Sequence, residues 1–256
     1  MQGRGRFQDR VAFITGGTSG IGQAAAIRFA REGASVAIVG RDQTRLEQTA
    51  RAVEAEGGQA LTLRADITRE PDVREAVAAT LSRFGRLDIA VPNAGILGPL
   101  VQITEIDVDD WDELMAVNIR GYFLTAKHVI PPMKAQGGGV IVVVASDSSF
   151  VAAPGQAAYC TTKGATLMFT KALSVDLAPD NIRVNCVCPS IVDTPMLEGL
   201  VGPAEMDALA AVNLGRHSAD QVAGHILFLA SDESASINGT SLVADFGALA
   251  RSNFPV

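Results

Sequence analysis

Short apolar runs alternate with longer amphipathic segments along nearly the whole chain. Residues 11–14 and 140–144 are apolar at every position, which is typical of strands covered on both faces of a parallel sheet. Further strands are expected at residues 35–39, near 61–63, and at 87–91, 182–187 and 242–244. Helices are expected at residues 22–31, 43–56, 108–133, 157–177 and 219–229. One more helix should begin near Pro71, and the long helix should stop near Pro131 and Pro132.

This order predicts one α/β domain over residues 1–256, built on a doubly wound, Rossmann-like parallel sheet. Strands buried on both faces require helices on both sides of the sheet. Right-handed crossovers then wind the sheet in both directions from its middle, and we expect about seven strands. The 256 residues suffice for such a domain, and no linker or repeat divides them.

Charge and cysteine usage exclude several classes of partner. The formal net charge is −7, and an acidic chain repels nucleic acid and anionic membranes, so neither is expected to bind. The chain has no long uncharged apolar run and only three cysteines, so we expect a cytoplasmic location. The histidines are scattered, and no metal site is expected. Residues 1–9, with sparse arginines, are expected to form a flexible tail.

A glycine-rich turn follows the first expected strand and opens the first helix. Residues 15–22 read T-G-G-T-S-G-I-G. Gly16, Gly20 and Gly22 would let the backbone turn sharply and approach a pyrophosphate, which the free N–H groups and dipole of a helix N-terminus attract. A tight structural turn would need the same residues, but the strand before it and the helix after it favour a dinucleotide site.

Tyr159 and Lys163 stand four residues apart on an expected helix, and Ser146 lies thirteen residues before the tyrosine. Positions i and i+4 share a helix face, so the ammonium would lie beside the phenol. A neighbouring cation favours the phenolate, and a serine hydroxyl could hold a carbonyl or alcohol oxygen at the same point. The alternative is a chance pair on a solvated helix face. Together with the glycine turn, the pair predicts a proton-transfer site.

The spacing G-x-x-x-G-x-G, together with Tyr-x-x-x-Lys, makes the chain resemble the short-chain dehydrogenase/reductase family from about Arg10 to Leu249. Further motifs of that family follow in order. They are Asp66 after the third strand, Asn93-Ala94-Gly95 after the fourth, Asn118 in the long helix, Ser146 after the fifth strand and Pro189 after the sixth. Three positions depart from the family pattern, namely Pro92, Ser190 in place of a glycine after Pro189, and Phe246 in place of a glycine near the end.

The resemblance implies an NAD(P)-dependent alcohol/carbonyl oxidoreductase and a role for each polar residue. Tyr159 would be the general acid in reduction and the general base in oxidation. Lys163 would lower the pKa of that tyrosine and bind the nicotinamide ribose. Ser146 would orient the reacting oxygen, and Asn118 would hold a water in a proton relay. The implied cofactor contacts are Gly16, Thr18, Ser19, Gly20, Ile21, Gly22, Arg41, Asp66, Ile67, Asn93, Ala94, Gly95, Tyr159, Lys163, Pro189, Val192 and Thr194.

The end of the second strand favours NADP over NAD. A carboxylate there would bind the ribose 2′-hydroxyl of NAD and repel the 2′-phosphate of NADP. The sequence has Gly40 at this position and Arg41 next, and a guanidinium suits a phosphate. Asp42 weakens the argument slightly, and Arg41 could instead stack on the adenine, so NAD stays the alternative.

The substrate is expected to be a neutral or partly apolar alcohol or ketone. Residues 195–215 contain no Arg or Lys and are expected to form a lid over it, although ordinary helix packing would give the same pattern. The apolar residues of this lid are Met196, Leu197, Leu200, Val201, Met206 and Leu209. Further substrate contacts are expected from Leu97, Gly98, Ser148, Phe150 and Pro154.

Two other functions remain open. A 3-oxoacyl-thioester reductase of fatty-acid type would need a basic docking surface for an acidic carrier protein, and Arg120 and Lys127 make a sparse one. A non-catalytic NAD(P)-sensing protein would usually lack the tyrosine or the lysine. The family often forms tetramers through two long helices and the last strand, so a homo-oligomer, a tetramer or a dimer, is expected.

Overall fold

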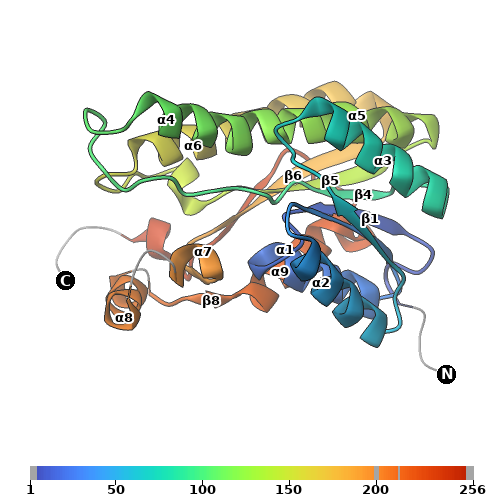
Figure 1. Cartoon of the computed structure of the whole chain (residues 1–256), viewed down its shortest axis with the longest axis horizontal. Coiled ribbons are helices and arrows are strands. Elements are labelled where there is room, and N and C mark those ends of the chain that lie inside the picture. Colours follow the sequence, from blue (N-terminus) through green and yellow to red (C-terminus); the bar gives the residue numbers. More distant parts are fainter. Residues whose placement is uncertain (1–4, 199–201, 213, 252–256) are drawn as a thin grey trace.

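The chain folds around a single parallel sheet of seven strands in the order β3-β2-β1-β4-β5-β6-β9 (Figure 1). The structure is a computed structural model that describes residues 5–198, 202–212 and 214–251. The strands are β1 (Val11–Thr15), β2 (Ser35–Gly40), β3 (Ala60–Arg64), β4 (Ile89–Val91), β5 (Gly139–Val144), β6 (Ile182–Pro189) and β9 (Ser241–Ala244). The order reverses between β1 and β4, which makes the sheet doubly wound and confirms the predicted fold.

Helices cover both faces of the sheet, as Figure 1 shows. One layer consists of α1 (Gly20–Arg31), α2 (Gln43–Ala55) and α9 (Ala219–Ala230). The other consists of α3 (Glu70–Phe84), α4 (Val108–Met115), α5 (Gly121–Ala135) and α6 (Ala157–Leu177). Each layer closes its own hydrophobic core against the sheet, with Ile14 and Phe29 in the first and Phe13 and Met133 in the second. Strands that are apolar on both faces thus take part in two cores.

The long helix differs from its prediction in two ways. A π-helical turn, Ala116–Arg120, separates α4 from α5. The predicted stop at Pro131 and Pro132 is wrong, because α5 continues to Ala135. A proline lacks an N–H donor but keeps its carbonyl, and the Pro132 carbonyl accepts from the Gln136 N–H at 3.1 Å.

A second, two-stranded sheet and two short helices follow β6 and were not predicted. β7 (Val192–Asp193) pairs in parallel with β8 (His217–Ser218). Between them lie α7 (Pro195–Glu198) and α8 (Pro203–Val212), in the segment expected to form a lid. The two-residue strands and the four-residue helix α7 carry too few residues to show a period in sequence, whereas the ten-residue α8 was missed as a helix.

Residues 5–9 of the expected tail pack against the domain. Phe7 is 2% exposed, and its ring meets the edge of Phe29 with the centroids 4.9 Å apart. The Arg6 guanidinium pairs with Glu32. Residues 1–4 lie outside the described part of the chain. Among the described helices, none combines the length and the apolar character that a membrane span requires.

One buried carboxylate joins the starts of two central strands. Asp88 is 3% exposed and accepts a hydrogen bond from the Val11 backbone N–H at 2.9 Å. Arg86 binds the same carboxylate with two donors, at 2.8 and 2.6 Å, and Arg10 adds a longer contact at 3.3 Å. The charge is therefore paired as well as buried, which is the condition for a buried ion to stabilise a fold.

We expect Asp88→Ala to lower the free energy of unfolding by about 2–4 kcal/mol, since it leaves a buried N–H and two guanidinium groups without their acceptor. Urea denaturation measures the change. As a control, Asp176→Ala on an exposed turn of α6 should shift the value by less than about 0.5 kcal/mol. Equal effects of the two substitutions would contradict the assigned role of Asp88.

Candidate active site

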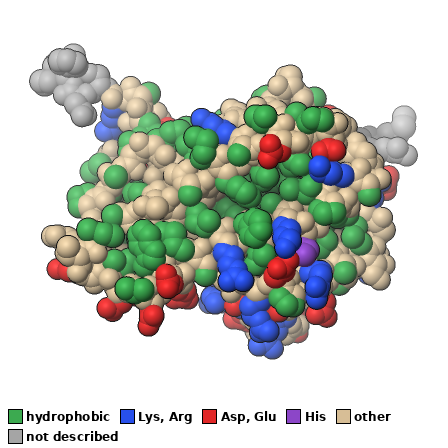
Figure 2. Space-filling model, turned by 90° about the horizontal axis from the view of Figure 1, so that it is seen from above, with side chains coloured by type: hydrophobic (Ala, Val, Ile, Leu, Met, Phe, Trp, Pro, Cys, Tyr) green, Lys and Arg blue, Asp and Glu red, His purple; other side chains and the backbone are tan. Residues whose placement is uncertain are grey.

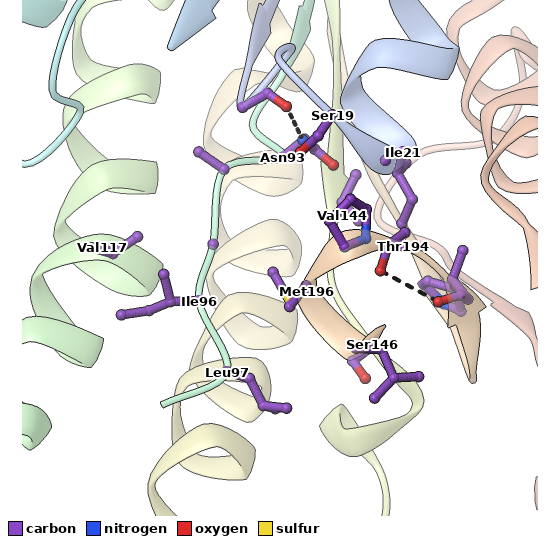
Figure 3. Close-up of a pocket in the computed structure, with 18 of the residues that line it drawn as sticks. Ser19, Ile21, Asn93, Ile96, Leu97, Val117, Val144, Ser146, Thr194 and Met196 are labelled. Atoms are coloured by element: carbon purple, nitrogen blue, oxygen red, sulfur yellow. Dashed lines mark hydrogen bonds between the residues drawn. The ribbon is translucent and has the colours of Figure 1, made fainter. Parts of the chain in front are cut away.

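A cleft crosses the carboxyl edge of the sheet, where β1, β4, β5 and β6 end. Figure 3 shows Ser19 and Asn93 at one end of it and Leu97 and Ser146 at the other. Thr194 and Met196 lie between these two ends. Open parallel sheets bind ligands in this place, outside the carboxyl ends of strands at the point where the strand order reverses.

The glycine turn lies against the end of β4 with almost no space between them. Gly16 has φ +65°, and a Cβ on it would lie 2.8 Å from the Ala94 Cα. A Cβ on Gly22 would lie 2.3 Å from the Gly16 carbonyl oxygen. The Ser19 side chain makes no capping hydrogen bond to α1 among the described residues. The turn therefore offers a close backbone approach and uncapped helix amides, which fit a pyrophosphate.

Beyond the glycine turn, where β2 ends, the cleft combines an arginine with a glycine that has little room for a side chain. A Cβ on Gly40 would lie 2.5 Å from the Thr18 Cγ2. Arg41 is exposed and lines the cleft. Asp42 instead caps α2 by accepting from the Arg45 N–H at 3.1 Å. Partial burial would raise the pKa of Asp66, but hydrogen bonds from Thr68 and nearby arginines hold that pKa below its usual range.

Ser146, Tyr159 and Lys163 all line the other end of the cleft. Ser146 follows β5, whereas the tyrosine and the lysine lie one turn apart on α6. The Lys163 Nζ donates to the Val144 carbonyl at 3.1 Å and lies 5.6 Å from the centroid of the Tyr159 ring. Lys163 is 5% exposed, so its ammonium is held in a nearly dry environment.

Burial governs the protonation of both groups on α6. It lowers the pKa of Lys163 to about 8. It raises the pKa of Tyr159, and a hydrogen bond with Ser146 opposes this shift without outweighing it. The predicted lowering of the tyrosine pKa by Lys163 is therefore not found, because desolvation of the phenol is the larger effect.

Asn118 lies behind the cleft rather than in its lining. It is 1% exposed and belongs to the π-helical turn, a feature that is common at functional sites. Its side chain accepts from the Ile96 N–H at 2.9 Å and donates to the Ile96 carbonyl at 2.8 Å. It also donates to the Thr162 hydroxyl at 3.1 Å, which ties the long helix to α6 beside the catalytic candidates.

The cleft brings together most of the residues that the sequence pointed to. Of the expected cofactor contacts, Gly22 lies outside the lining, under the turn. Of the expected substrate contacts, Leu97 and Ser148 line the cleft, whereas Gly98, Phe150 and Pro154 do not. The expected lid contributes Pro195, Met196 and Leu197. Leu200 and Val201 lie outside the described residues, as does the side chain of Met206.

Three polar residues of the lining were not predicted as contacts. Asp147 and Gln156 flank the Ser146 end, and Ser190 lies at the end of β6. A usable signal existed for Asp147, because a polar side chain directly after a buried strand reaches the carboxyl edge of a parallel sheet. The described residues contain no group of three or more His, Cys, Asp or Glu side chains that could hold a metal ion.

A doubly wound sheet with a glycine turn at this cleft is typical of dinucleotide-binding proteins. A family model described as Enoyl-(Acyl carrier protein) reductase matches residues 16–248. The chain is 42% identical to 2-(R)-hydroxypropyl-CoM dehydrogenase of Xanthobacter autotrophicus, over 92% of this chain and 97% of that protein. It is 39% identical to cyclopentanol dehydrogenase of a Comamonas species, over 95% and 98%. The crystal structure of levodione reductase superposes with a TM-score of 0.92 at 32% identity, over 96% of this chain and 100% of that one.

The chain belongs to the short-chain dehydrogenase/reductase family. Members of this family use NAD or NADP, and this chain is an NAD(P)-dependent oxidoreductase that acts on CH–OH groups. The resemblance noted in the sequence is thus confirmed over nearly the whole chain.

The buried amine should leave a signature in the pH dependence of stability. Because the pKa of Lys163 falls from an ordinary 10.5 to about 8 in the folded chain, the unfolded chain binds more protons between these values. The free energy of unfolding should therefore rise with pH across this window, by about 3 kcal/mol at most.

We expect Lys163→Met to abolish that rise and to be the more stable protein at pH 7, because no ammonium is then buried. Denaturant titrations of the cofactor-free proteins at several pH values measure it. Lys171→Met, an exposed change on the same helix, should keep the wild-type slope. Parallel curves for wild type and Lys163→Met would refute the shifted pKa.

Proposed function

We propose that this enzyme interconverts a small neutral alcohol and its ketone, using NADP. One observation carries the proposal: Ser146, Tyr159 and Lys163 meet in the cleft that begins at the glycine turn. A proton donor and a dinucleotide cradle in one cleft are what hydride transfer to a carbonyl needs.

Each polar residue then has a distinct task. The bound nicotinamide supplies or accepts the hydride. Tyr159 gives its phenolic proton to the carbonyl oxygen during reduction and takes the alcohol proton during oxidation. Lys163, 5.6 Å from the centre of the tyrosine ring, stabilises the negative charge that develops on the phenol. Ser146 holds the reacting oxygen, and Asn118 acts as a positioning residue through Ile96 and Thr162.

The cofactor would lie along the whole cleft. The glycine turn would hold the pyrophosphate, Asp66 and Ile67 would flank the adenine, and Lys163 would bind the nicotinamide ribose. Backbone and side-chain contacts to the rest of the cofactor come from the remaining predicted positions that line the cleft, which are Asn93, Ala94, Gly95, Pro189, Val192 and Thr194.

The lining of the Ser146 end supports a neutral substrate. Ile96, Leu97 and Met196 form an apolar side. The one charged group of this end among the described lining residues, apart from Lys163, is Asp147, and a carboxylate repels anionic substrates. A neutral alcohol such as cyclopentanol, for which one relative is named, therefore suits this lining better than an anionic substrate would.

Three features of the cleft at the end of β2 support NADP as the cofactor. Arg41 lines the cleft and acts on Asp66 only by charge at a distance, without a salt bridge to any residue that the structure describes, so its guanidinium is available for a 2′-phosphate. Gly40 has no room for the carboxylate that NAD would use, and Asp42 is occupied as the cap of α2. NAD would still bind, because no group at this end of the cleft repels its neutral ribose 2′-hydroxyl.

A 3-oxoacyl-thioester reductase is the second candidate, favoured by the description of the matching family model. Its carrier protein would need basic docking residues. Lys127 is already paired with Glu70 at 2.7 Å, which leaves Arg120 on that helix. The sensing function is the least favoured, because all four polar residues of the family site are present.

A homo-oligomer also stays a prediction. Hydrophobic side chains gather on the face formed by α4, α5 and α6 (Figure 2). They include Phe123, 48% exposed, Met168, 62% exposed, and Val175, 74% exposed. Covering such a face would stabilise a dimer or tetramer. The cytoplasmic location likewise remains a prediction.

We expect Tyr159→Phe to lower kcat by about 10²- to 10⁴-fold, because the proton donor is removed while the ring is kept. Nicotinamide absorbance with cyclopentanol or cyclopentanone measures it. Tyr122→Phe makes the same chemical change at a tyrosine outside the cleft lining and should lose less than about tenfold. Comparable activity of the two variants would count against Tyr159 as the acid/base.

We expect Arg41→Ala to lower kcat/KM for NADP by about 10- to 100-fold and to change kcat/KM for NAD little, because a charged hydrogen bond to the phosphate is lost. Steady-state kinetics with both cofactors measure the split. Arg45→Ala, an exposed arginine one turn further on, is the matched control. An unchanged NADP preference in Arg41→Ala would reject the phosphate role.

A further inference from the structure

Asp147 is a carboxylate placed directly beside the reacting end of the cleft. It follows Ser146 and begins a short 3₁₀ turn, Asp147–Ser149, which turns the chain at the cleft edge. It is half-buried and lines the cleft. The Ser146 hydroxyl donates to its Oδ1 at 2.9 Å. The serine that holds the reacting oxygen is therefore hydrogen-bonded to an acid.

This acid has no cationic partner in the described chain. No Lys, Arg or His side chain among the described residues forms an ion pair with Asp147. The nearest strong cation of the cleft, Lys163, is bound to the Val144 carbonyl. Burial raises the pKa of Asp147, hydrogen bonds from Ser146 and Ser148 oppose this shift, and the charged neighbour that acts on it is another acid, Asp245. A half-buried carboxylate without a counter-ion gains from any donor that enters the cleft.

The part of the cleft lining around Asp147 is polar, unlike the apolar side formed by Ile96, Leu97 and Met196. Ser148, Gln156 and Ser190 line the cleft with it. The Ser190 Oγ is buried and has no hydrogen-bond partner among the described atoms. Unsatisfied buried hydroxyls are rare in native proteins, so this one also points to a polar ligand group.

We propose that Asp147 is a specificity residue that binds a hydrogen-bond donor carried by the substrate on the carbon next to its reacting carbon. The donor would be the second hydroxyl of a vicinal diol or the ammonium of a vicinal amino alcohol. The inference rests on the proposed function, since it assumes that Ser146 holds the reacting oxygen.

The spacing explains why the donor belongs on the adjacent carbon. Ser146 Oγ and Asp147 Oδ1 are 2.9 Å apart, so the two substrate heteroatoms that they hold must also be close neighbours. A serine hydroxyl has one proton to donate, and Ser146 donates it in a hydrogen bond to Asp147. A substrate donor that satisfies Asp147 frees this proton for the reacting oxygen, so the donor improves turnover as well as binding.

The test compares cyclohexanol, 1,2-cyclohexanediol and 2-aminocyclohexanol, each as cis and trans isomers where these exist, as substrates with NADP. We expect wild-type kcat/KM to be higher by about tenfold or more for one or both of the vicinal compounds than for cyclohexanol. Asp147→Ala should abolish this ratio. The near-isosteric Asp147→Asn keeps a carbonyl acceptor, so it should preserve a preference for the diol and lose one for the amino alcohol.

Glu54→Gln removes one negative charge from the exposed side of α2 and should keep the wild-type ratio. A wild-type preference for cyclohexanol, or a ratio that Asp147→Ala leaves unchanged, would overturn the proposal. A purely structural role for Asp147 would lower activity with all the alcohols alike and leave the ratio as it was.

A second readout needs no turnover. The same compounds are titrated by calorimetry into Tyr159→Phe loaded with NADP⁺, with and without Asp147→Ala. Tighter binding of a vicinal compound that disappears with Asp147→Ala supports the inference even if no alcohol is turned over, in which case the proposed function alone fails. Equal binding of all compounds overturns the inference.

Discussion

The carboxyl ends of β1 and β4 are held together by a few hydrogen bonds, and the cleft depends on them. The Thr15 hydroxyl accepts from the backbone N–H groups of Asn93 at 3.0 Å and Ala94 at 3.2 Å. In return, the Asn93 side chain donates to the carbonyls of Thr15 and Gly16 at 3.0 and 3.2 Å. The glycine turn is thus fixed against the neighbouring strand, which leaves its helix amides directed into the cleft.

Desolvation then decides how the other end of the cleft behaves. The same burial that raises the pKa of Tyr159 lowers the pKa of Lys163 to about 8. Both shifts favour the neutral forms, but a Lys163 with a pKa of about 8 still carries its proton at pH 7, so the pair is a neutral phenol beside an ammonium. A dinucleotide and a substrate that enter such a site meet donors already in place, which is the basis of preorganised catalysis. Burying the amine lowers the free energy of unfolding of the protein, so this cost is already included in the folded state before the reaction begins.

The sequence predicted the sheet, the helices on both faces and the meeting of Ser146, Tyr159 and Lys163 in one cleft, because these follow from local patterns. An apolar strand, a glycine turn and a Tyr-x-x-x-Lys pair are each contained within a few residues. The features that were missed depend on contacts between distant segments. The passage of α5 through Pro131, the side-chain bonds of Asn118 with Ile96, and the direction of the tyrosine pKa shift all follow from what packs against them.

Asp147 differs from these features, because its place directly after a buried strand was a usable local signal, and it adds a carboxylate to the Ser146 end of the cleft. Among the described lining residues, one end of the cleft carries Arg41 beside Asp66, and the Ser146 end carries Asp147 as well as Lys163. Each end therefore holds one acid and one base, and what distinguishes the Ser146 end is the hydrogen bond that the Ser146 hydroxyl donates to Asp147. Because that hydrogen bond joins the proposed holder of the reacting oxygen to an acid, a substrate group that donates to Asp147 would also change which donors Ser146 can offer.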